Sequence, residues 1–160
     1  MRPSAVVTGA ADGEGRALVL ALAERGCAVV VVYLADQAAA DAVVEEAFAR
    51  GGTALALRAD LTDEFDLERL FGESTRALGG VDVVAHASDR GTGLVMAHAA
   101  RRLRDGGAIF SLARWTGMLA AELRARGITV NGRPAGLEPA GPPHDVATVL
   151  AMFDRWHATR

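Results

Sequence analysis

The chain has 160 residues and a mass of 16.6 kDa, the size of one compact domain, and we expect a single domain over residues 1–160. Hydrophobic residues make up 51% of the chain and charged residues 23%, with a net charge of −3, which excludes an intrinsically disordered protein. The longest apolar stretch, residues 27–35, is far shorter than the ~20 residues that span a bilayer. With no secretory-signal pattern at the first residues, we expect a cytoplasmic protein with neither a membrane nor a nucleic acid as partner.

Apolar runs typical of buried strands alternate with segments of helical periodicity along the whole chain. Strands are expected at residues 4–8, 28–33, 53–58, 81–86, 108–112 and 128–131. Helices are expected at residues 15–25, 65–78, 94–104, 114–126 and 144–157, and one more runs from a cap at Asp36 to residue 50 with Ala39, Val43, Ala47 and Phe48 facing inward. This order predicts a doubly wound, Rossmann-type α/β fold: a parallel sheet of about six strands, with helices on both faces and a ligand crevice at the carboxyl ends of the strands.

A glycine-rich turn with the sequence T-G-A-A-D-G-E-G, residues 8–15, follows the first strand and opens the first helix. Glycines in such a turn permit a tight bend, let the backbone approach a pyrophosphate, and allow close helix–strand packing. The amino terminus of the helix offers free N–H groups to the anion. The alternative is a tight strand-to-helix turn that binds nothing.

Several segments, in chain order, resemble the short-chain dehydrogenase/reductase family, and within it the 3-oxoacyl-carrier-protein reductases. They are residues 8–15 (the family's T-G-x-x-x-G-x-G), 59–63 (A-D-L-T-D), 81–88 (V-D-V-V-A-H-A-S, where the family has D-x-x-V-N-N-A-G), 119–123 (L-A-A-E-L), 127–131 (G-I-T-V-N), 134–136 (P-A-G) and 145–147 (D-V-A). The resemblance implies a site for NAD(P) in which Asp60 holds the adenine. The implied cofactor residues are Gly9, Asp12, Gly13, Glu14, Gly15, Tyr33, Asp60, Leu61 and Ala87.

The catalytic residues of that family are missing. Its enzymes reduce carbonyls with a serine, a tyrosine and a lysine four residues after the tyrosine. Here Tyr33, the only tyrosine, lies in the second predicted strand, and all 17 basic residues are arginine. The fifth strand runs almost directly into the next helix, with Arg114 about where the serine would be and Ser111 expected in the core. A second deletion follows the fourth strand. We therefore expect a minimal, truncated family member with no catalytic residue of the family kind.

Carboxylates in the glycine turn are expected to weaken the cofactor. Asp12 and Glu14 would lie near a pyrophosphate, and like charges about 4 Å apart repel by on the order of 1 kcal/mol in water. Two such groups would lower affinity by about tenfold or more. Arg16 could offset part of this charge, but Tyr33 stands where NAD-dependent relatives carry an acid. We expect either no cofactor or weakly bound NAD(P).

The histidines show no metal-ligand spacing, and the single cysteine, Cys27, excludes a disulfide framework and a cysteine-rich zinc site. No metal is expected. His86 ends a central strand, and with Asp82 it could serve as an acid or base in a non-redox reaction. The simpler interpretation is a polar side chain that caps the strand end.

Charge and apolar spacing allow several partners. Residues 1–89 carry a net charge of −8 and residues 90–160 one of +5. The positive half could face an anionic ligand, an acidic partner or the acidic half, or it could simply line solvated helix faces. The resemblance implies a homo-oligomer through helices 94–105 and 114–126. Its apolar seam would be Met96, Ala99, Ala100 and Leu103 with Trp115, Met118 and Leu119, unless these pack only on their own sheet.

Three functions follow as hypotheses. The first is a degenerate family member without ordinary ketoreductase activity that acts as a ligand-binding, scaffold or accessory component, taking a small-molecule or acyl-carrier ligand in an acyl-carrier or polyketide-type pathway. The second is a non-redox enzyme, for example a cyclase, isomerase or dehydratase, in the vacated crevice. The third is a residual NAD(P)-dependent oxidoreductase. A further interpretation is the structural half of a ketoreductase cut from a larger enzyme.

Overall fold

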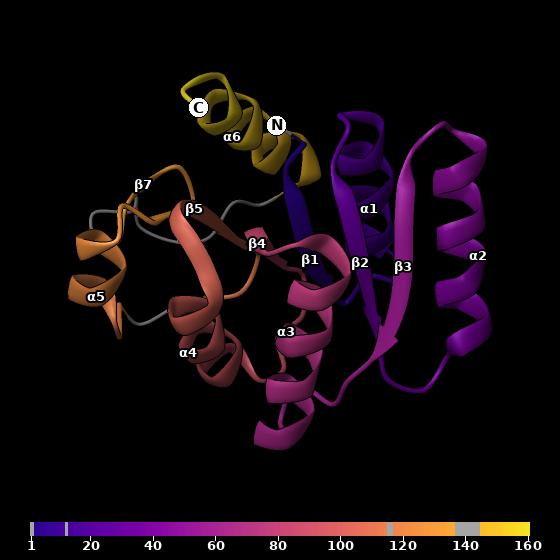
Figure 1. Ribbon diagram of the computed structural model, residues 1–160, viewed down its shortest axis with the longest axis horizontal. Coiled ribbons are helices and arrows are strands. Elements are labelled where there is room, and N and C mark those ends of the chain that lie inside the picture. The colour runs from indigo at the N-terminus through magenta and orange to yellow at the C-terminus, as the bar shows by residue number, and fades with distance from the viewer. Residues whose placement is uncertain (1, 12, 115–116, 137–144) are drawn as a thin grey trace.

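One seven-stranded sheet forms the centre of the molecule in the computed structural model, which describes residues 2–11, 13–114, 117–136 and 145–160 (Figure 1). The strand order is β3-β2-β1-β4-β5-β6-β7. The strands are β1 (Ser4–Thr8), β2 (Ala28–Tyr33), β3 (Thr53–Arg58), β4 (Val81–His86), β5 (Leu103–Ser111), β6 (Thr129–Val130) and β7 (Arg133–Pro134). The first six pair in parallel and β7 is antiparallel to β6, so the predicted Rossmann-type fold is confirmed.

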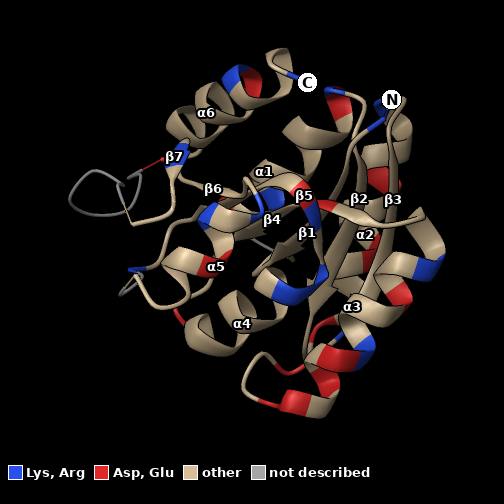
Figure 2. Cartoon of the chain, turned by 60° about the vertical axis from the view of Figure 1, so that its left-hand side comes forward, with Lys and Arg blue, Asp and Glu red and all other residues tan. Residues whose placement is uncertain are grey.

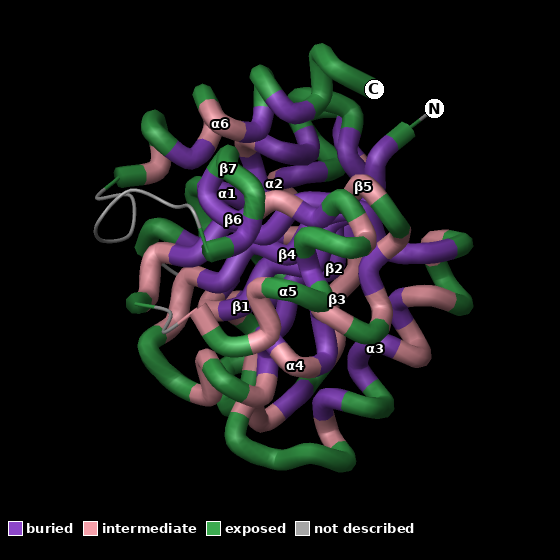
Figure 3. Tube along the Cα trace, turned by 90° about the vertical axis from the view of Figure 1, so that its left-hand side faces the viewer, coloured by how far each residue is buried: buried purple, intermediate pink, exposed green. Residues whose placement is uncertain are grey.

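Helices cover both faces of this sheet. They are α1 (Gly13–Glu24), α2 (Gln37–Ala49), α3 (Glu64–Leu78), α4 (Thr92–Arg102), α5 (Ala120–Ala125) and α6 (Val146–Ala158). One core joins apolar residues of α1, α2 and α6 to the sheet, and a second core joins α3, α4 and α5 to its other face. The central strands β1 and β4 lie fully buried between these layers, whereas β7 at the edge of the sheet is exposed (Figure 3).

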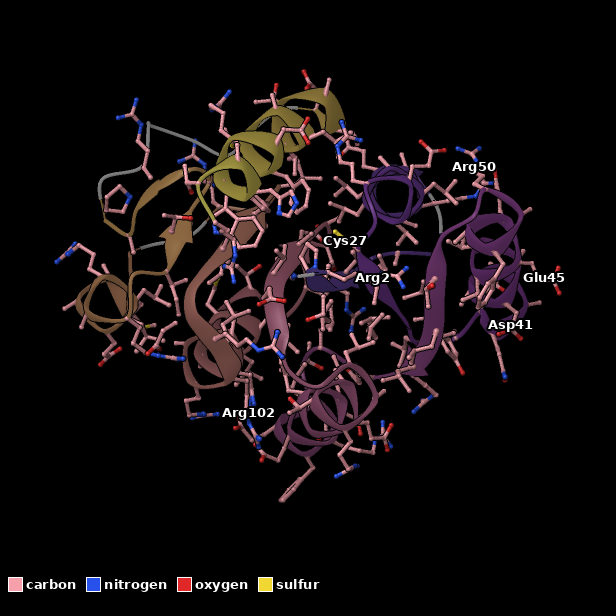
Figure 4. All side chains as sticks on the ribbon, turned by 45° about the horizontal axis from the view of Figure 1, so that its top comes forward. Arg2, Cys27, Asp41, Glu45, Arg50 and Arg102 are labelled. Carbon is pink, nitrogen blue, oxygen red and sulfur yellow. The ribbon has the colours of Figure 1, made fainter. Side chains whose placement is uncertain are left out.

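The uninterrupted valine run of β2 fits a strand that is covered on both faces. Val29 and Val31 pack in the first core, and Val30 and Val32 in the second, because side chains alternate across a strand. Cys27, just before β2, is fully buried in the first core, near Arg2 at the amino-terminal end of the sheet (Figure 4). Two layers of helix are therefore needed to cover this sheet.

Aspartates begin three of the helices. A side-chain oxygen of Asp36 accepts a hydrogen bond from Ala39 N at 2.9 Å, as the sequence predicts, and Asp63 and Asp145 cap α3 and α6 in the same way. Phe48, expected to face inward on α2, is 56% exposed, so that expectation is wrong. The helix buries Ala40, Val43 and Ala47, and Phe48 follows 100° further round the axis. Asp41 and Glu45 also project from α2 away from the sheet (Figure 4).

The predicted strand limits are confirmed on one side of the sheet and wrong on the other. β1, β2, β3 and β4 have the expected ends, whereas β5 begins five residues early, β6 keeps two residues, and β7 was not expected. The helix predicted at residues 114–126 is confirmed only over α5, Ala120–Ala125. Gly117 and Leu119 have φ angles of 79° and 66°, in the left-handed region, so within the described residues the helix starts only at Ala120.

Part of the apolar seam expected between protomers packs within the chain's own core. Met96, Ala99 and Leu103 are buried in the chain's own second core, while Met118 is 64% exposed. Trp115 lies outside the described residues. The homo-oligomer stays a prediction, which the solution mass of a Trp115→Glu variant would check; an unchanged mass would contradict it.

The basic second half of the chain pairs with the acidic first half. Acidic residues gather at the start of α3, and arginines end α4 (Figure 2). Arg101 Nη2 lies 3.4 Å from Glu64 Oε1, and Arg102, labelled in Figure 4, pairs with Glu68. Much of the charge asymmetry is therefore balanced within the molecule. Within the described part of the chain, no helix combines the length and apolar character needed to cross a bilayer.

Candidate functional site

Two glycines of the turn after β1 occupy places where backbone atoms approach closely. A Cβ on Gly9, whose φ is 60°, would lie 2.5 Å from Ala87 O at the end of β4. A Cβ on Gly15 would lie 1.8 Å from Gly9 O, so α1 packs directly on the turn. Gly13 has a φ of 53° and open space around it. The turn thus requires glycine at positions 9 and 15 for its own packing.

A pocket of about 280 Å³ opens beside this turn, at the carboxyl ends of β1 and β2. Its described wall consists of Gly9, Ala10, Ala11, Val32, Tyr33, Leu34, Ala35, Asp36, Ala59, Leu61, Ser88 and Arg90. This is the crevice position at which doubly wound sheets bind ligands. This volume is slightly below the about 300–1,000 Å³ typical of small-molecule sites.

The structure brings together only part of the predicted cofactor set. Gly9, Tyr33 and Leu61 line the pocket, and Ala87 contacts the turn behind it. Gly13 and Glu14 lie exposed in the first turn of α1, and Gly15 is buried beneath the turn. Asp12 lies outside the described residues.

Asp60 has a local role in the structure. Its Oδ1 accepts hydrogen bonds from Thr62 N at 2.9 Å and from the Thr62 hydroxyl at 2.7 Å. These bonds lower the pKa of the Asp60 carboxyl, with Arg90 and Arg58 adding a smaller effect. Within the described pocket wall Asp60 is absent, and its neighbour Leu61 takes that place.

Two charged residues of the pocket wall were missed as site residues. Asp36 was interpreted only as a helix cap, and the structure shows that it caps α2 and lines the pocket at once. Its place three residues after Tyr33 was the available signal. Arg90 comes from the loop between β4 and α4, and no sequence pattern marks it. Its position depends on how that shortened loop folds.

His86 is a buried strand-end residue, as the simpler interpretation predicts. Its Nδ1 lies 2.8 Å from Thr8 Oγ1 and its Nε2 lies 3.0 Å from Thr92 Oγ1. Burial lowers the pKa of His86 to about 4, so the imidazole is neutral at neutral pH. With both ring nitrogens bonded to threonines, His86 ties β4 to β1 and to the start of α4.

The Asp82–His86 pair considered above does not form. Asp82 lies four residues earlier, about 13 Å along the strand. Its carboxylate accepts hydrogen bonds from Ser4 N at 2.9 Å and from Arg104 Nη1 at 3.0 Å, at the opposite end of the sheet. Among the described residues, no group of three His, Cys, Asp or Glu side chains could hold a metal ion.

The polar groups at the end of β5 are bonded to the chain itself. Ser111, buried as expected, donates from Oγ to Ala113 O at 2.8 Å. Its backbone N–H donates to Asn131 Oδ1 at 2.9 Å. Tyr33 lies three strands away from Ser111, about 14 Å at the usual strand spacing. A tyrosine on β2 therefore does not reach a substrate at the end of β5.

Comparison with known proteins agrees with this architecture. A sequence profile described as short chain dehydrogenase matches residues 3–102. The chain belongs to this family. It is 36% identical over 128 residues to versicolorin reductase 1 of Aspergillus parasiticus, a match covering 66% of this chain and 49% of that protein. It is 38% identical over 86 residues to the 3-oxoacyl-[acyl-carrier-protein] reductase FabG of Staphylococcus aureus, covering 54% of this chain and 35% of that protein.

The fold is shared with solved members of the family. A dehydrogenase/reductase of Sinorhizobium meliloti superposes with a TM-score of 0.73 and 29% identity, covering 91% of this chain and 78% of the other. The chain spans only about a third to a half of the length of these two curated relatives.

The residues present fit one half of a dinucleotide better than the other. The glycine turn and the pocket suit a nucleoside, with a backbone free of Cβ atoms at Gly9 and apolar walls at Val32 and Leu61. The diphosphate would meet the Glu14 carboxylate in the first turn of α1, which already balances the positive end of that helix. The described pocket thus has apolar walls beside the glycine turn, and Glu14 places a carboxylate in the first turn of α1.

Proposed function

We propose that this chain is a member of the short-chain dehydrogenase family that keeps the pocket beside the glycine turn but lacks ordinary ketoreductase activity. It acts as a ligand-binding, scaffold or accessory component. The observation that carries the proposal is the place of Tyr33. It is the only tyrosine of the chain, and it lines the pocket at the end of β2. Without a lysine anywhere in the sequence, no Tyr–Lys pair can deliver a proton.

The surroundings of β5 support the same proposal. Ser111 and His86 are fully buried and hydrogen-bonded to other residues of the chain. A general acid has to reach the reacting oxygen within hydrogen-bond distance. Neither side chain is presented to the crevice in this way, and no described contact favours the non-redox alternative at His86.

Weak binding of NAD(P) belongs to the proposal. In the sequence Asp12 directly precedes α1, and Glu14 lies in the first turn of that helix. A phosphate would compete with their carboxylates for the amino end of the helix. The similarity to a 3-oxoacyl-[acyl-carrier-protein] reductase supports an acyl-carrier or polyketide-type setting, with an acyl-carrier or small-molecule ligand.

The first test is hydride turnover. Purified protein is mixed with NADH or NADPH and a panel of ketones and quinones, and the absorbance of the reduced nicotinamide is followed. We expect no enzyme-dependent oxidation. Turnover at an ordinary enzymatic rate, about 1 s⁻¹ or faster, would overturn the proposal.

The second test concerns the carboxylates of the loop. Replacing Asp12→Arg together with Glu14→Ile should tighten NADH binding by about tenfold or more, and Glu14→Gln alone should give a smaller gain. Glu45→Gln removes one negative charge from the outward face of α2 and serves as the matched control (Figure 4). Equal dissociation constants for the loop variants and the control would show that charge repulsion is not the cause of weak binding.

A further inference from the structure

A second pocket lies at the amino-terminal end of the sheet. Its volume is about 230 Å³, and its described wall consists of Arg2, Pro3, Asp82, His157 and Arg160. Pro3 directly precedes β1, whereas the glycine turn directly follows it, and the five residues of that strand measure about 17 Å. Figure 4 shows Arg2 at this end of the sheet, and Figure 1 shows that α6 ends beside the start of β1. The pocket is therefore separate from the crevice beside the glycine turn.

Asp82, the carboxylate in the described wall, already has its donors. Its side chain is 1% exposed, and Oδ2 accepts a hydrogen bond from Ser4 N at 2.9 Å. Arg104 Nη1 donates to both carboxylate oxygens, at 3.0 and 3.1 Å, and Arg160 Nη2 lies 3.4 Å from Oδ1. Because two guanidinium groups share one buried carboxylate, Asp82 has no negative charge left to attract a cation.

Two backbone carbonyls at this end of the sheet are bonded to arginine as well. Arg2 Nε donates to Gly26 O, just after the end of α1, at 2.7 Å. Gly106 O in β5 accepts hydrogen bonds from Trp156 Nε1 and from Arg160 Nη1, each at 3.0 Å. A carbonyl oxygen without a donor repels an anion, and one at the end of a helix carries part of the helix dipole. These bonds reduce that repulsion.

Positive charge exceeds negative charge around the pocket. Arg104 alone balances Asp82, so the Arg160 guanidinium brings additional charge. Arg2 forms no ion pair with any residue that the structure describes, and its Nη2 donates to the neutral Thr53 hydroxyl at 2.8 Å. The contacts of both arginines position their side chains before a ligand arrives, which lowers the entropic cost of binding. The pocket therefore suits an anion.

We propose that this pocket binds a phosphate group between the Arg2 and Arg160 guanidiniums, with a ring N–H of His157 as a further donor. Arginine recognises phosphate oxygens through pairs of N–H groups, and the opposite charges strengthen each hydrogen bond. The volume of about 230 Å³ admits free phosphate or a small phosphate monoester. The inference does not depend on the proposed function, because the crevice lies at the other end of the sheet.

The experiment is a calorimetric titration of the full chain with inorganic phosphate and, separately, with glycerol phosphate, at constant pH and ionic strength. We expect saturable binding to one site per chain. Arg2→Gln and Arg160→Gln should each raise the dissociation constant by about tenfold, because a charge-assisted contact is lost. Arg155→Gln is the matched control, since Arg155 is exposed on α6 but absent from the described pocket wall. It should change the constant by less than about twofold, because a screened surface charge contributes little.

Thermal midpoints measured without phosphate establish that each variant is folded, and Arg2→Lys is a second variant at the same position. Lysine keeps the charge but lacks the planar fork of arginine. Arg2→Lys should therefore bind phosphate less tightly than the parent chain and more tightly than Arg2→Gln. Tighter binding of glycerol phosphate than of inorganic phosphate supports an ester as the source of the phosphate group, and the reverse order supports free phosphate.

The inference is overturned if phosphate at about 10 mM gives no saturable binding. It is also overturned if Arg2→Gln and Arg160→Gln keep the parent affinity, since the anion then binds elsewhere on the chain. A loss in Arg155→Gln as large as in the other two variants would show that overall charge, and not this pocket, attracts the anion. Hydride turnover remains the separate test of the missing reductase activity.

Discussion

The two sides of the sheet differ in how their backbone is determined. On the side of the sheet formed by β3, β2, β1 and β4, the strands are five or six residues long, and they end where the sequence predicts. On the other side β6 and β7 have two residues each, and Leu119 and Asn131 are non-glycine residues with positive φ. The first side contains the pocket and the glycine turn. The comparison teaches that the part of this family fold around the glycine turn can stay regular while the described elements beyond β5 are short.

The largest expected effect is on the regular side, at Gly15. Gly15→Ala places a methyl group 1.8 Å from Gly9 O and should lower the free energy of unfolding by at least about 3 kcal/mol, since backbone has to move. The matched control is Gly13→Ala, which meets open space and should cost about 1–2 kcal/mol for its positive φ. Urea unfolding of both variants measures the difference. Equal losses would mean that α1 does not pack on the turn as described.

The next largest loss of stability is expected at Asp82, which connects β1 to β5. Asp82 is buried and bonded to Ser4 on β1 and to Arg104 on β5, so Asp82→Ala should lower the free energy of unfolding by about 2–3 kcal/mol. Asp105→Ala removes the partner of Arg126 from an exposed pair and should cost less than about 1 kcal/mol. Chemical denaturation of both variants provides the comparison. A larger loss for Asp105→Ala would contradict the ranking.

A third prediction concerns pH. Burial lowers the pKa of His86 from 6.5 to about 4, so the unfolded chain binds more protons between these values. The free energy of unfolding is therefore unaffected by His86 protonation well above pH 6.5. It falls as the pH drops toward 4, and the loss is roughly 2 kcal/mol at pH 5.

Urea midpoints at pH 7.5 and pH 5 measure this loss. His86→Asn should reduce the difference between the two pH values, whatever its effect on stability at pH 7.5. The exposed His157→Asn should leave the difference as in the parent chain. A pH dependence unchanged in His86→Asn would show that His86 is not its source.

The smallest effect is expected at Phe48. Because this ring is 56% exposed, Phe48→Ala should change the free energy of unfolding by less than about 0.5 kcal/mol. Val43→Ala, five residues earlier and on the buried face of α2, should cost about 2 kcal/mol. A reversal in denaturant unfolding would place Phe48 in the core after all.

The sequence predicts the regular side well because each strand there has one dominant local signal. The residues of β2 are β-branched almost throughout, and Asp36 marks the start of the helix that follows. The helix predicted at 114–126 is only partly confirmed because Gly117 and Leu119 adopt left-handed backbone angles, which apolar spacing does not reveal. Two-residue strands such as β6 depend on their neighbours and have no pattern of their own.

The site is predictable to the extent that it depends on local sequence. The glycine turn, Tyr33 and Leu61 follow strand ends, and strand ends were predicted correctly. Arg90 was missed because its place depends on Gly91 meeting Leu61 O, a contact between loops that are distant in sequence. Asp60 stays a predicted adenine contact, and the sequence did not indicate that Thr62, two residues later, bonds its carboxylate through both a hydroxyl and an amide.

The buried position of Cys27 has a practical consequence. It is the only sulfhydryl in the chain, and burial raises its pKa to about 12, so almost no thiolate exists at pH 8 while the protein is folded. An alkylating reagent can then attack only molecules that have opened the layer of α1 and β2 around it. The rate of labelling at this one sulfur would therefore time the opening of the domain, with no added dye or engineered probe.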